Sequence, residues 1–353
     1  MMFINHFRKP REDYDIMKLN LEQIKQITSG AAVINEQDGV FSFNRFTPEQ
    51  QELYRVTSQK FYDRVQLTSG IKFYFRTNSK NLFIKIKTLS LTLRKYFSLD
   101  VFVNNNIIGC IDNFSNEKLE HNYTCQEFTN GEFSENFELG EGEKTVCVYL
   151  PWSVKTWVEE ISVDDDAFIT EAKPDKKLLA FGDSITQGFD AMRSSNKYIT
   201  KIADLMGAQE FNKGIGGERF FPELALLKEE FVPDYITVAY GTNDWSVTDE
   251  ETFKTKCKAF YANLRESYPD TKIFAITPIW RKDRDEYRPF GCFDNVEKYI
   301  KEIVAPMENV VFISGYDFVP KDEDYFADLR LHPNDKGFAC YAENLYNKIK
   351  EYI

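Results

Sequence analysis

Hydrophobic and polar positions follow two different patterns along the 353-residue chain. From about residue 30 to 170, apolar and polar side chains alternate, which is typical of strands with one face in water. The strands expected in this part cover residues 84–87, 89–94, 99–103, 107–108, 145–150 and 158–163. Turn residues separate them, and the only helix expected is a short one over residues 16–27. The pattern predicts an antiparallel β-sandwich.

From about residue 176 the pattern changes. Short apolar runs without alternation are typical of parallel strands that are covered on both faces. These runs lie at 178–181, 235–240, 273–279 and 310–313, with a weaker one at 209–211. Between and after them, residues 198–206, 253–268 and 338–349 have helical periodicity, and Thr248 with Glu251 forms a candidate capping box. Alternating strands and helices predict a doubly wound α/β fold.

A chain of this length is too long for one ordinary core, so two domains are expected. The change of pattern coincides with residues 171–175, a charged stretch that contains a proline and suits a linker. We therefore predict a β-sandwich domain over residues 1–172 and an α/β domain over residues 173–353.

Polar and glycine-rich segments follow the apolar runs of the second half. They cover residues 182–188, 212–217 and 241–244, and a fourth, 328–334, precedes the last helix. In an open parallel sheet, ligands bind beyond the carboxyl ends of the strands. The four segments are therefore expected to meet at one edge of the sheet.

These segments contain the parts that acyl transfer needs. Ser184 stands where a strand gives way to a turn, as a nucleophile would, although no G-x-S-x-G elbow surrounds it. Donors for a developing oxyanion are available from the backbone N–H groups of Ser184 and Gly217 and from the amide of Asn243. Glycine at 217 lets the backbone approach a substrate closely.

The general base is assigned by elimination among three histidines. His6 lies in a polar terminal stretch and His121 in a polar loop of the strand-rich half. His332 alone lies in the α/β half, just ahead of a helix. We therefore expect His332 to take the proton of Ser184.

These segments resemble the conserved blocks of the SGNH (GDSL) hydrolase superfamily over residues 176–353. The resemblance implies a flavodoxin-like three-layer fold and ester hydrolysis through an acyl-enzyme, without metal or cofactor. It makes Ser184, Gly217, Asn243 and His332 the residues of the four blocks, with Asp183 and Asp244 as supporting neighbours. The strand-rich half resembles, more weakly, the jelly-roll domain of family-two carbohydrate esterases, in which a backbone carbonyl can orient the histidine.

The last block departs from the family pattern. The usual spacing is Asp-x-x-His, whereas Asp328 precedes His332 by four residues. An extra residue can bulge and leave the Asp328 carboxylate on the imidazole. Alternatively, a backbone carbonyl orients His332 in a dyad, or Asp324 does so.

The substrate is expected to be a small molecule or oligosaccharide that carries a short ester, above all O-acetyl. Trp245 and Trp280 follow strand ends and could offer flat faces to sugar rings at the rim of the cleft. The chain has no broad apolar segment around Ser184 for a long acyl chain. The alternatives are a lysophospholipase- or thioesterase-type acylhydrolase, and an inactive carbohydrate-binding protein.

Charge and cysteine content indicate which classes of partner and which cellular compartment to expect. The net charge of −12, with both signs interleaved, argues against nucleic acid and anionic membranes as partners. No apolar run near the start resembles a signal peptide. Six scattered cysteines without C-x-x-C spacing suggest free, mostly buried thiols in a reducing compartment. We expect a cytoplasmic protein, and the sequence leaves a homo-oligomer open.

Overall fold

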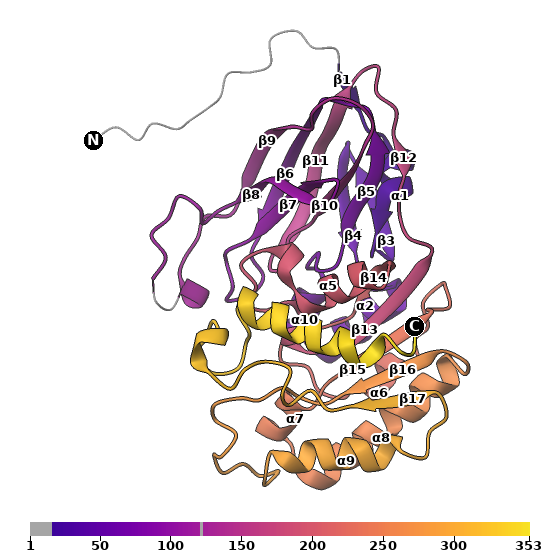
Figure 1. Cartoon of the computed structure of the whole chain (residues 1–353), viewed down its shortest axis with the longest axis vertical. Helices are drawn as coiled ribbons and strands as arrows, with labels where there is room; N and C mark the ends of the chain where they lie inside the picture. Colours follow the sequence, from indigo (N-terminus) through magenta and orange to yellow (C-terminus); the bar gives the residue numbers. More distant parts are fainter. Residues whose placement is uncertain (1–15, 121–122) are drawn as a thin grey trace.

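The computed structural model describes residues 16–120 and 123–353 and contains three β-sheets. In Figure 1, two sheets from the first half of the chain occupy the upper part of the molecule. The third sheet, from the second half, lies below them with helices around it. His6 and His121 lie outside the described residues.

The first half forms two antiparallel sheets, with strand orders β3-β4-β11-β6-β9 and β12-β5-β10-β7-β8. β1 pairs with β11, and β2 with β5. The first sheet contains β1 (Ile16–Lys18), β3 (Val33–Gln37), β4 (Val40–Asn44), β6 (Asn81–Leu89), β9 (Glu132–Glu138) and β11 (Lys155–Asp164). The second contains β2 (Thr28–Ser29), β5 (Lys72–Thr77), β7 (Ser98–Val103), β8 (Asn106–Asp112), β10 (Lys144–Tyr149) and β12 (Thr170–Glu171).

The two sheets share one core, as the alternating pattern predicts. Ile84 and Ile86 of β6 are fully buried and belong to the same apolar cluster as Phe73 of β5 and Val148 of β10. In β6, every second residue therefore points inward, between the sheets. The predicted antiparallel sandwich is confirmed.

Two local predictions in this half are wrong. The strand expected at 89–94 is absent among the described residues, because β6 ends at Leu89. Beyond it, Thr92 bonds through its hydroxyl to the N–H of Arg94, a local bond that competes with strand pairing. The expected helix over 16–27 starts only at Leu21 (α1, Leu21–Ile27), since Asn20 caps it in a capping box with Gln23.

Two helices between β4 and β5 were not predicted, α2 (Pro48–Thr57) and α3 (Gln59–Val65). Their apolar residues pack on the second half of the chain and not in the core of the sandwich. Tyr54 and Val65 lie in one buried cluster with Leu179 and Ile215. The amide of Gln50 donates to the carbonyl of Leu227. The first half thus contributes to the core of the second.

The third sheet is parallel, with strand order β14-β13-β15-β16-β17, which is the flavodoxin-like order. Its strands are β13 (Lys176–Gly182), β14 (Ala208–Asn212), β15 (Tyr235–Ala239), β16 (Lys272–Ile276) and β17 (Val310–Ile313). Its helices are α4 (Ser184–Gln187), α5 (Tyr198–Leu205), α6 (Pro222–Ala225), α7 (Thr242–Val247), α8 (Glu250–Ser267), α9 (Asp294–Val304) and α10 (Asp335–Ile349). The predicted three-layer fold is confirmed.

Side chains of β13 show why both faces are covered. Leu178 and Ala180 pack into the cluster formed with α5 and α10, whereas Leu179 and Phe181 pack into the cluster formed with α8 and α9. A strand buried on both faces needs an apolar residue at every position, which is the pattern seen in the sequence. The capping box predicted at Thr248 is wrong by one residue, because Asp249 caps α8 and accepts from the N–H of Thr252.

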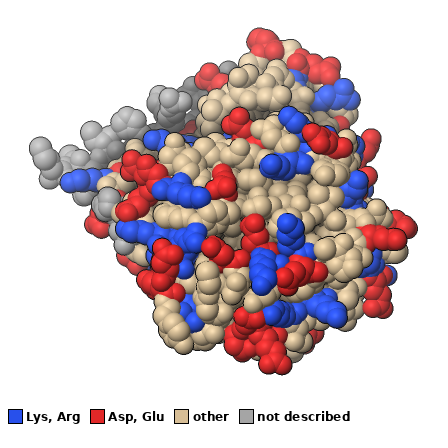
Figure 2. All heavy atoms as spheres, turned by 60° about the horizontal axis from the view of Figure 1, so that its bottom comes forward, with Lys and Arg blue, Asp and Glu red and all other residues tan. Residues whose placement is uncertain are grey.

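The cysteines are unpaired, but the expectation that most are buried is wrong: only Cys147 and Cys257 are buried. Among residues 16–120 and 123–353, every helix is too short or too polar to cross a lipid bilayer. Figure 2 shows acidic and basic side chains intermixed on one face of the molecule, in keeping with the interleaved charges of the sequence.

Candidate active site

Ser184 lies at the turn between β13 and α4. Asp183 caps α4, and its carboxylate accepts the N–H of Ile185 at 2.9 Å. Gly182 is required at the end of the strand, because a Cβ there would lie 2.1 Å from the hydroxyl of Thr186. The tight turn presents the Ser184 side chain at the carboxyl edge of the sheet, with 4% of the residue exposed.

The loop before α10 brings His332 to this serine across 148 residues of sequence. Nε2 of His332 lies 2.9 Å from Oγ of Ser184, within hydrogen-bonding distance. Nδ1 of the same ring lies 2.8 Å from Oδ2 of Asp328. A hydroxyl, an imidazole and a carboxylate thus form one chain of hydrogen bonds, the arrangement that activates a serine.

The extra residue in the last block forms a bulge. Leu329 has a φ of +56°, so the chain turns sharply after Asp328. Oδ1 of Asp328 accepts the N–H groups of Arg330, Leu331 and His332 at 3.0, 2.7 and 3.0 Å, which leaves Oδ2 for the imidazole. Asp324 is exposed, and its backbone carbonyl accepts from Asn334.

Charge and hydrogen bonding keep Asp328 ionised. Burial alone would raise the pKa of this carboxyl, but the hydrogen bond and charge of His332, with the backbone N–H donors, lower it well below its usual value. An ionised Asp328 holds the proton of His332 on Nδ1, which leaves Nε2 free to accept the proton of Ser184.

A second carboxylate, which the sequence reasoning missed, lies on the same side of His332. Oδ2 of Asp190 is 3.5 Å from Nδ1 of His332. Asp190 is fully buried and paired with Arg94 of the sandwich half through two hydrogen bonds of 2.7 and 2.9 Å. Its φ of +74° is unusual for a residue other than glycine. No sequence signal marks Asp190, because its partner lies 96 residues away.

The expected oxyanion donors lie on segments bonded to the nucleophile turn. The N–H of Gly216 donates to Gln187 at 2.8 Å, and the amide of Asn212 donates to the carbonyl of Thr186 at 2.7 Å. Gly217 has a φ of +81°, which glycine adopts without strain. In the described part of the chain, its N–H has no protein acceptor and stays available.

Asn243 bonds to Glu218, the residue that follows Gly217. Its amide donates one N–H to the carbonyl of Glu218 at 3.0 Å, which orients the NH2 group and leaves the second N–H to donate elsewhere. The amide of Asn243 is thus linked to the segment of Gly217 through Glu218.

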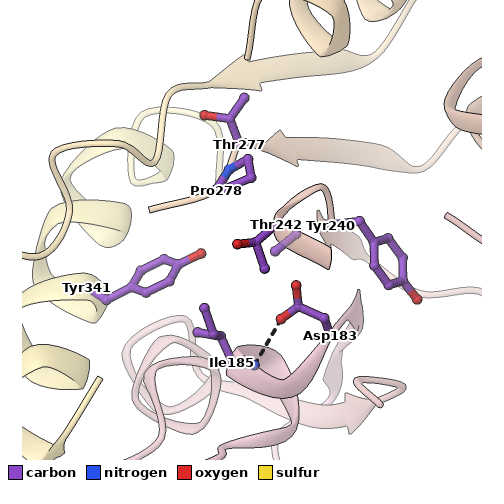
Figure 3. A pocket seen from close by; sticks show the side chains of 8 residues that line it. Asp183, Ile185, Tyr240, Thr242, Thr277, Pro278 and Tyr341 are labelled. Carbon is purple, nitrogen blue, oxygen red and sulfur yellow. Dashed lines mark hydrogen bonds between the residues drawn. The ribbon is translucent and has the colours of Figure 1, made fainter. Parts of the chain in front are cut away.

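The carboxylates of Asp183 and Asp244 are buried beneath the site. Burial raises the pKa of Asp183 to about 6 and that of Asp244 to about 7. A cavity of about 20 Å³ adjoins Asp183, and Figure 3 shows its carboxylate, Thr242 and the Tyr341 hydroxyl facing one another there. Such a volume suits one water molecule and no acyl chain. The carboxylate of Asp183 supports the nucleophile turn, and that of Asp244 accepts the N–H of Phe220 at 3.4 Å.

The two tryptophans differ. Trp245 is fully buried: its Nε1 donates to the carbonyl of Gly291 at 2.9 Å, and its ring packs on Phe293. The prediction that it borders the cleft is wrong, because its place on α7 turns it into the core. Trp280 is half-buried and packs on Phe326, two residues before Asp328. Its contact with a substrate stays a prediction.

Asp190, Asp328 and His332 bring three atoms of metal-ligand type within 4.8 Å of one another. Each of these groups already has a hydrogen-bond partner: Arg94 holds Asp190, three N–H groups hold Asp328, and Ser184 holds His332. The cluster therefore combines a base, His332, with two carboxylates that can orient its ring.

Comparison with known proteins agrees with this geometry. Residues 180–340 match the GDSL-like Lipase/Acylhydrolase family. No curated protein sequence matches the chain.

Solved structures resemble the chain over both halves. A salicylyl-acyltransferase from a tetracycline biosynthetic pathway is 18% identical, with a TM-score of 0.75 over 92% of this chain and 94% of that one. A GDSL-like lipase from Bacteroides ovatus is 19% identical, with a TM-score of 0.74 over 96% and 98%. A family two carbohydrate esterase from Cellvibrio japonicus is 15% identical, with a TM-score of 0.63 over 96% and 98%. At these identities the likeness concerns the two-part fold.

Proposed function

Because residues 180–340 form a GDSL-like lipase/acylhydrolase domain, we propose that the protein is a serine esterase that removes short acyl groups, above all O-acetyl, from carbohydrate. The observation that carries the proposal is the chain of hydrogen bonds from Ser184 through His332 to Asp328, at 2.9 and 2.8 Å. A buried hydroxyl on an oriented imidazole is an activated nucleophile.

The reaction follows from this geometry. His332 takes the proton of Ser184 through Nε2 as Oγ attacks the ester carbonyl. The N–H groups of Ser184 and Gly217 and the amide of Asn243 stabilise the oxyanion. His332 then protonates the leaving alcohol, and the acyl group stays on Ser184. Water, activated by His332 in turn, releases the acid.

Close packing around the nucleophile supports a small acyl group. Ser184 is 4% exposed, and the ring of Phe189 packs beside His332 with ring centroids 5.7 Å apart. The carbohydrate part of the proposal rests on the likeness to the family two carbohydrate esterase, in which the β-sandwich half is also present.

The test compares the wild type with Ser184→Ala on p-nitrophenyl esters and on acetylated manno-, xylo- and chito-oligosaccharides. We expect kcat to fall at least about 10⁴-fold in the variant. Acetate esters should be preferred to esters of eight or more carbons. Retention of activity in Ser184→Ala would overturn the mechanism, and preference for long acyl chains would favour a lipid-directed acylhydrolase.

A parallel assay with an alcohol acceptor separates hydrolysis from acyl transfer. Both reactions pass through the same acyl-enzyme, and one structural relative is a salicylyl-acyltransferase. We expect free acetate as the main product. Transfer of the acyl group to the acceptor in excess of acetate release would contradict the proposal of an esterase.

A further inference from the structure

Two arginines of the sandwich half hold the segment that carries Gly217. Nη1 of Arg45, a fully buried residue, donates to the carbonyls of Asn212 and Gly214 at 2.9 and 2.7 Å. Nη1 of Arg64, at the end of α3, donates to the carbonyl of Gly216. Alternate carbonyls of the segment therefore each accept a bond from a guanidinium.

The third of these bonds acts on the oxyanion donor directly. The carbonyl of Gly216 and the N–H of Gly217 belong to one peptide group, and the described peptide bonds are all trans. In a trans peptide the carbonyl and the N–H point in opposite directions. When Arg64 holds the carbonyl, the N–H is fixed away from the guanidinium. A charged donor on the carbonyl also polarises the N–H and strengthens the bond that it can donate.

The surroundings of Arg64 hold its guanidinium in place. Its backbone carbonyl accepts from Nη2 of Arg45 at 2.9 Å, and its guanidinium lies 5.9 Å from the ring centre of Phe189. The guanidinium also lies close to Gly217, where a Cβ would be 3.2 Å from Nη1.

We propose that Arg64, from the sandwich half, is a positioning residue of the oxyanion hole: it aims and polarises the N–H of Gly217 through the peptide group that the two glycines share. The inference rests on the proposed esterase function. It gives the sandwich half a part in catalysis, since a group in this half sets the strength of a donor in the other.

The test replaces Arg64 by Met, which keeps an unbranched side chain against Phe189 but removes the donor. Activity on p-nitrophenyl acetate is divided by the number of active sites, counted by complete labelling of Ser184 with a fluorophosphonate. We expect kcat per active site to fall about ten- to hundredfold, less than the loss of a whole donor. KM should stay within about twofold, and the pH profile should keep its shape. Arg64→Lys should recover part of the rate.

A matched control is Arg76→Ala, which removes an exposed arginine of β5 that pairs with Glu143. Its kcat should equal that of the wild type. If Arg64→Met does not fold, Arg64→Lys and Arg64→Gln carry the same test, with smaller losses expected.

Two outcomes separate the proposals. If Ser184→Ala is inactive while Arg64→Met keeps the wild-type kcat per active site, the role of Arg64 is wrong and the esterase proposal stands. A loss of total activity that is explained entirely by fewer labelled sites also overturns it, since that is a merely structural effect. If Ser184→Ala stays active, the proposed function fails, and the role of Arg64 fails with it.

Discussion

At the scale of single residues, the carboxylate of Asp328 is expected to decide the tautomer of His332. In Asp328→Asn the amide can donate to Nδ1, which moves the ring proton to Nε2 and removes the base from Ser184. We expect kcat to fall about 10⁴-fold, as in other serine triads. The measurement is kcat on p-nitrophenyl acetate per labelled active site. A loss under tenfold would mean that Asp328 is not the group that orients the ring.

Asp190 is expected to act as a weaker second partner of the same imidazole. In Asp328→Ala nothing donates to Nδ1, and Asp190, at 3.5 Å, can take the bond. We therefore expect Asp328→Ala to retain more activity than Asp328→Asn. The double variant Asp328→Ala/Asp190→Asn should lose that remainder. Equal rates for Asp328→Ala and Asp328→Asn would contradict this role.

Glu218 should make stability depend on pH. It accepts from the hydroxyls of Tyr54 and Tyr240, and burial raises its pKa to about 8. Above about pH 4.5 the unfolded chain ionises this group, whereas the folded chain keeps the proton up to about pH 8. The folded state thus binds more protons in this window, and stability falls as pH rises, by up to about 1.4 kcal/mol per pH unit.

Glu218→Gln should remove that contribution. Urea unfolding at pH 5, 6, 7 and 8 should give a flatter profile for the variant than for the wild type, with exposed Glu223→Gln as the control. Parallel profiles for all three proteins would show that Glu218 is ionised in the folded state throughout.

Sequence reasoning identified the residues whose place follows from the fold alone. Ser184 stands at a strand end and His332 ahead of a helix start, and the topology brings the two within hydrogen-bonding distance. Asp190 and Arg64 could not be found in this way, since each is placed by a contact between the two halves. Trp245 was misplaced because a position after a strand end does not say which way a helical side chain turns.

At the scale of elements, α8 offers a test of its cap. Asp249 accepts from the N–H of Thr252 at 2.8 Å. Asp249→Ala should cost about 1 kcal/mol of unfolding free energy, because it leaves a helix N–H without its acceptor. Urea unfolding measures the change, and Glu251→Ala, which leaves the cap intact, should change little. A larger loss of unfolding free energy in Glu251→Ala than in Asp249→Ala would instead support the capping box predicted for Thr248 and Glu251.

The strands of both halves were predictable because their periods reflect burial on one face or on both. The helices α2 and α3 were not. They cover an apolar face of the parallel-sheet half. The sequence does not indicate this face, because it depends on how the two halves pack together. Local pattern cannot report a partner more than 100 residues away.

At the scale of the whole molecule, the two halves are expected to unfold together. Phe46 is fully buried, follows a strand of the sandwich, and lies in the cluster that contains Phe181 and Val238 of the parallel sheet. A cluster shared in this way couples the two units, since opening either one exposes it. Calorimetry of the wild type should therefore show one transition.

Two matched core variants sharpen this prediction. Phe46→Ala lies at the shared cluster and Phe43→Ala in the core of the sandwich, where Phe43 is also buried. Each should cost about 3–5 kcal/mol and move the single transition down without dividing it. If Phe43→Ala instead splits the transition and leaves one part at the wild-type temperature, the halves are independent. In that case the cluster around Phe46 would be a packing contact that does not couple the unfolding of the two units.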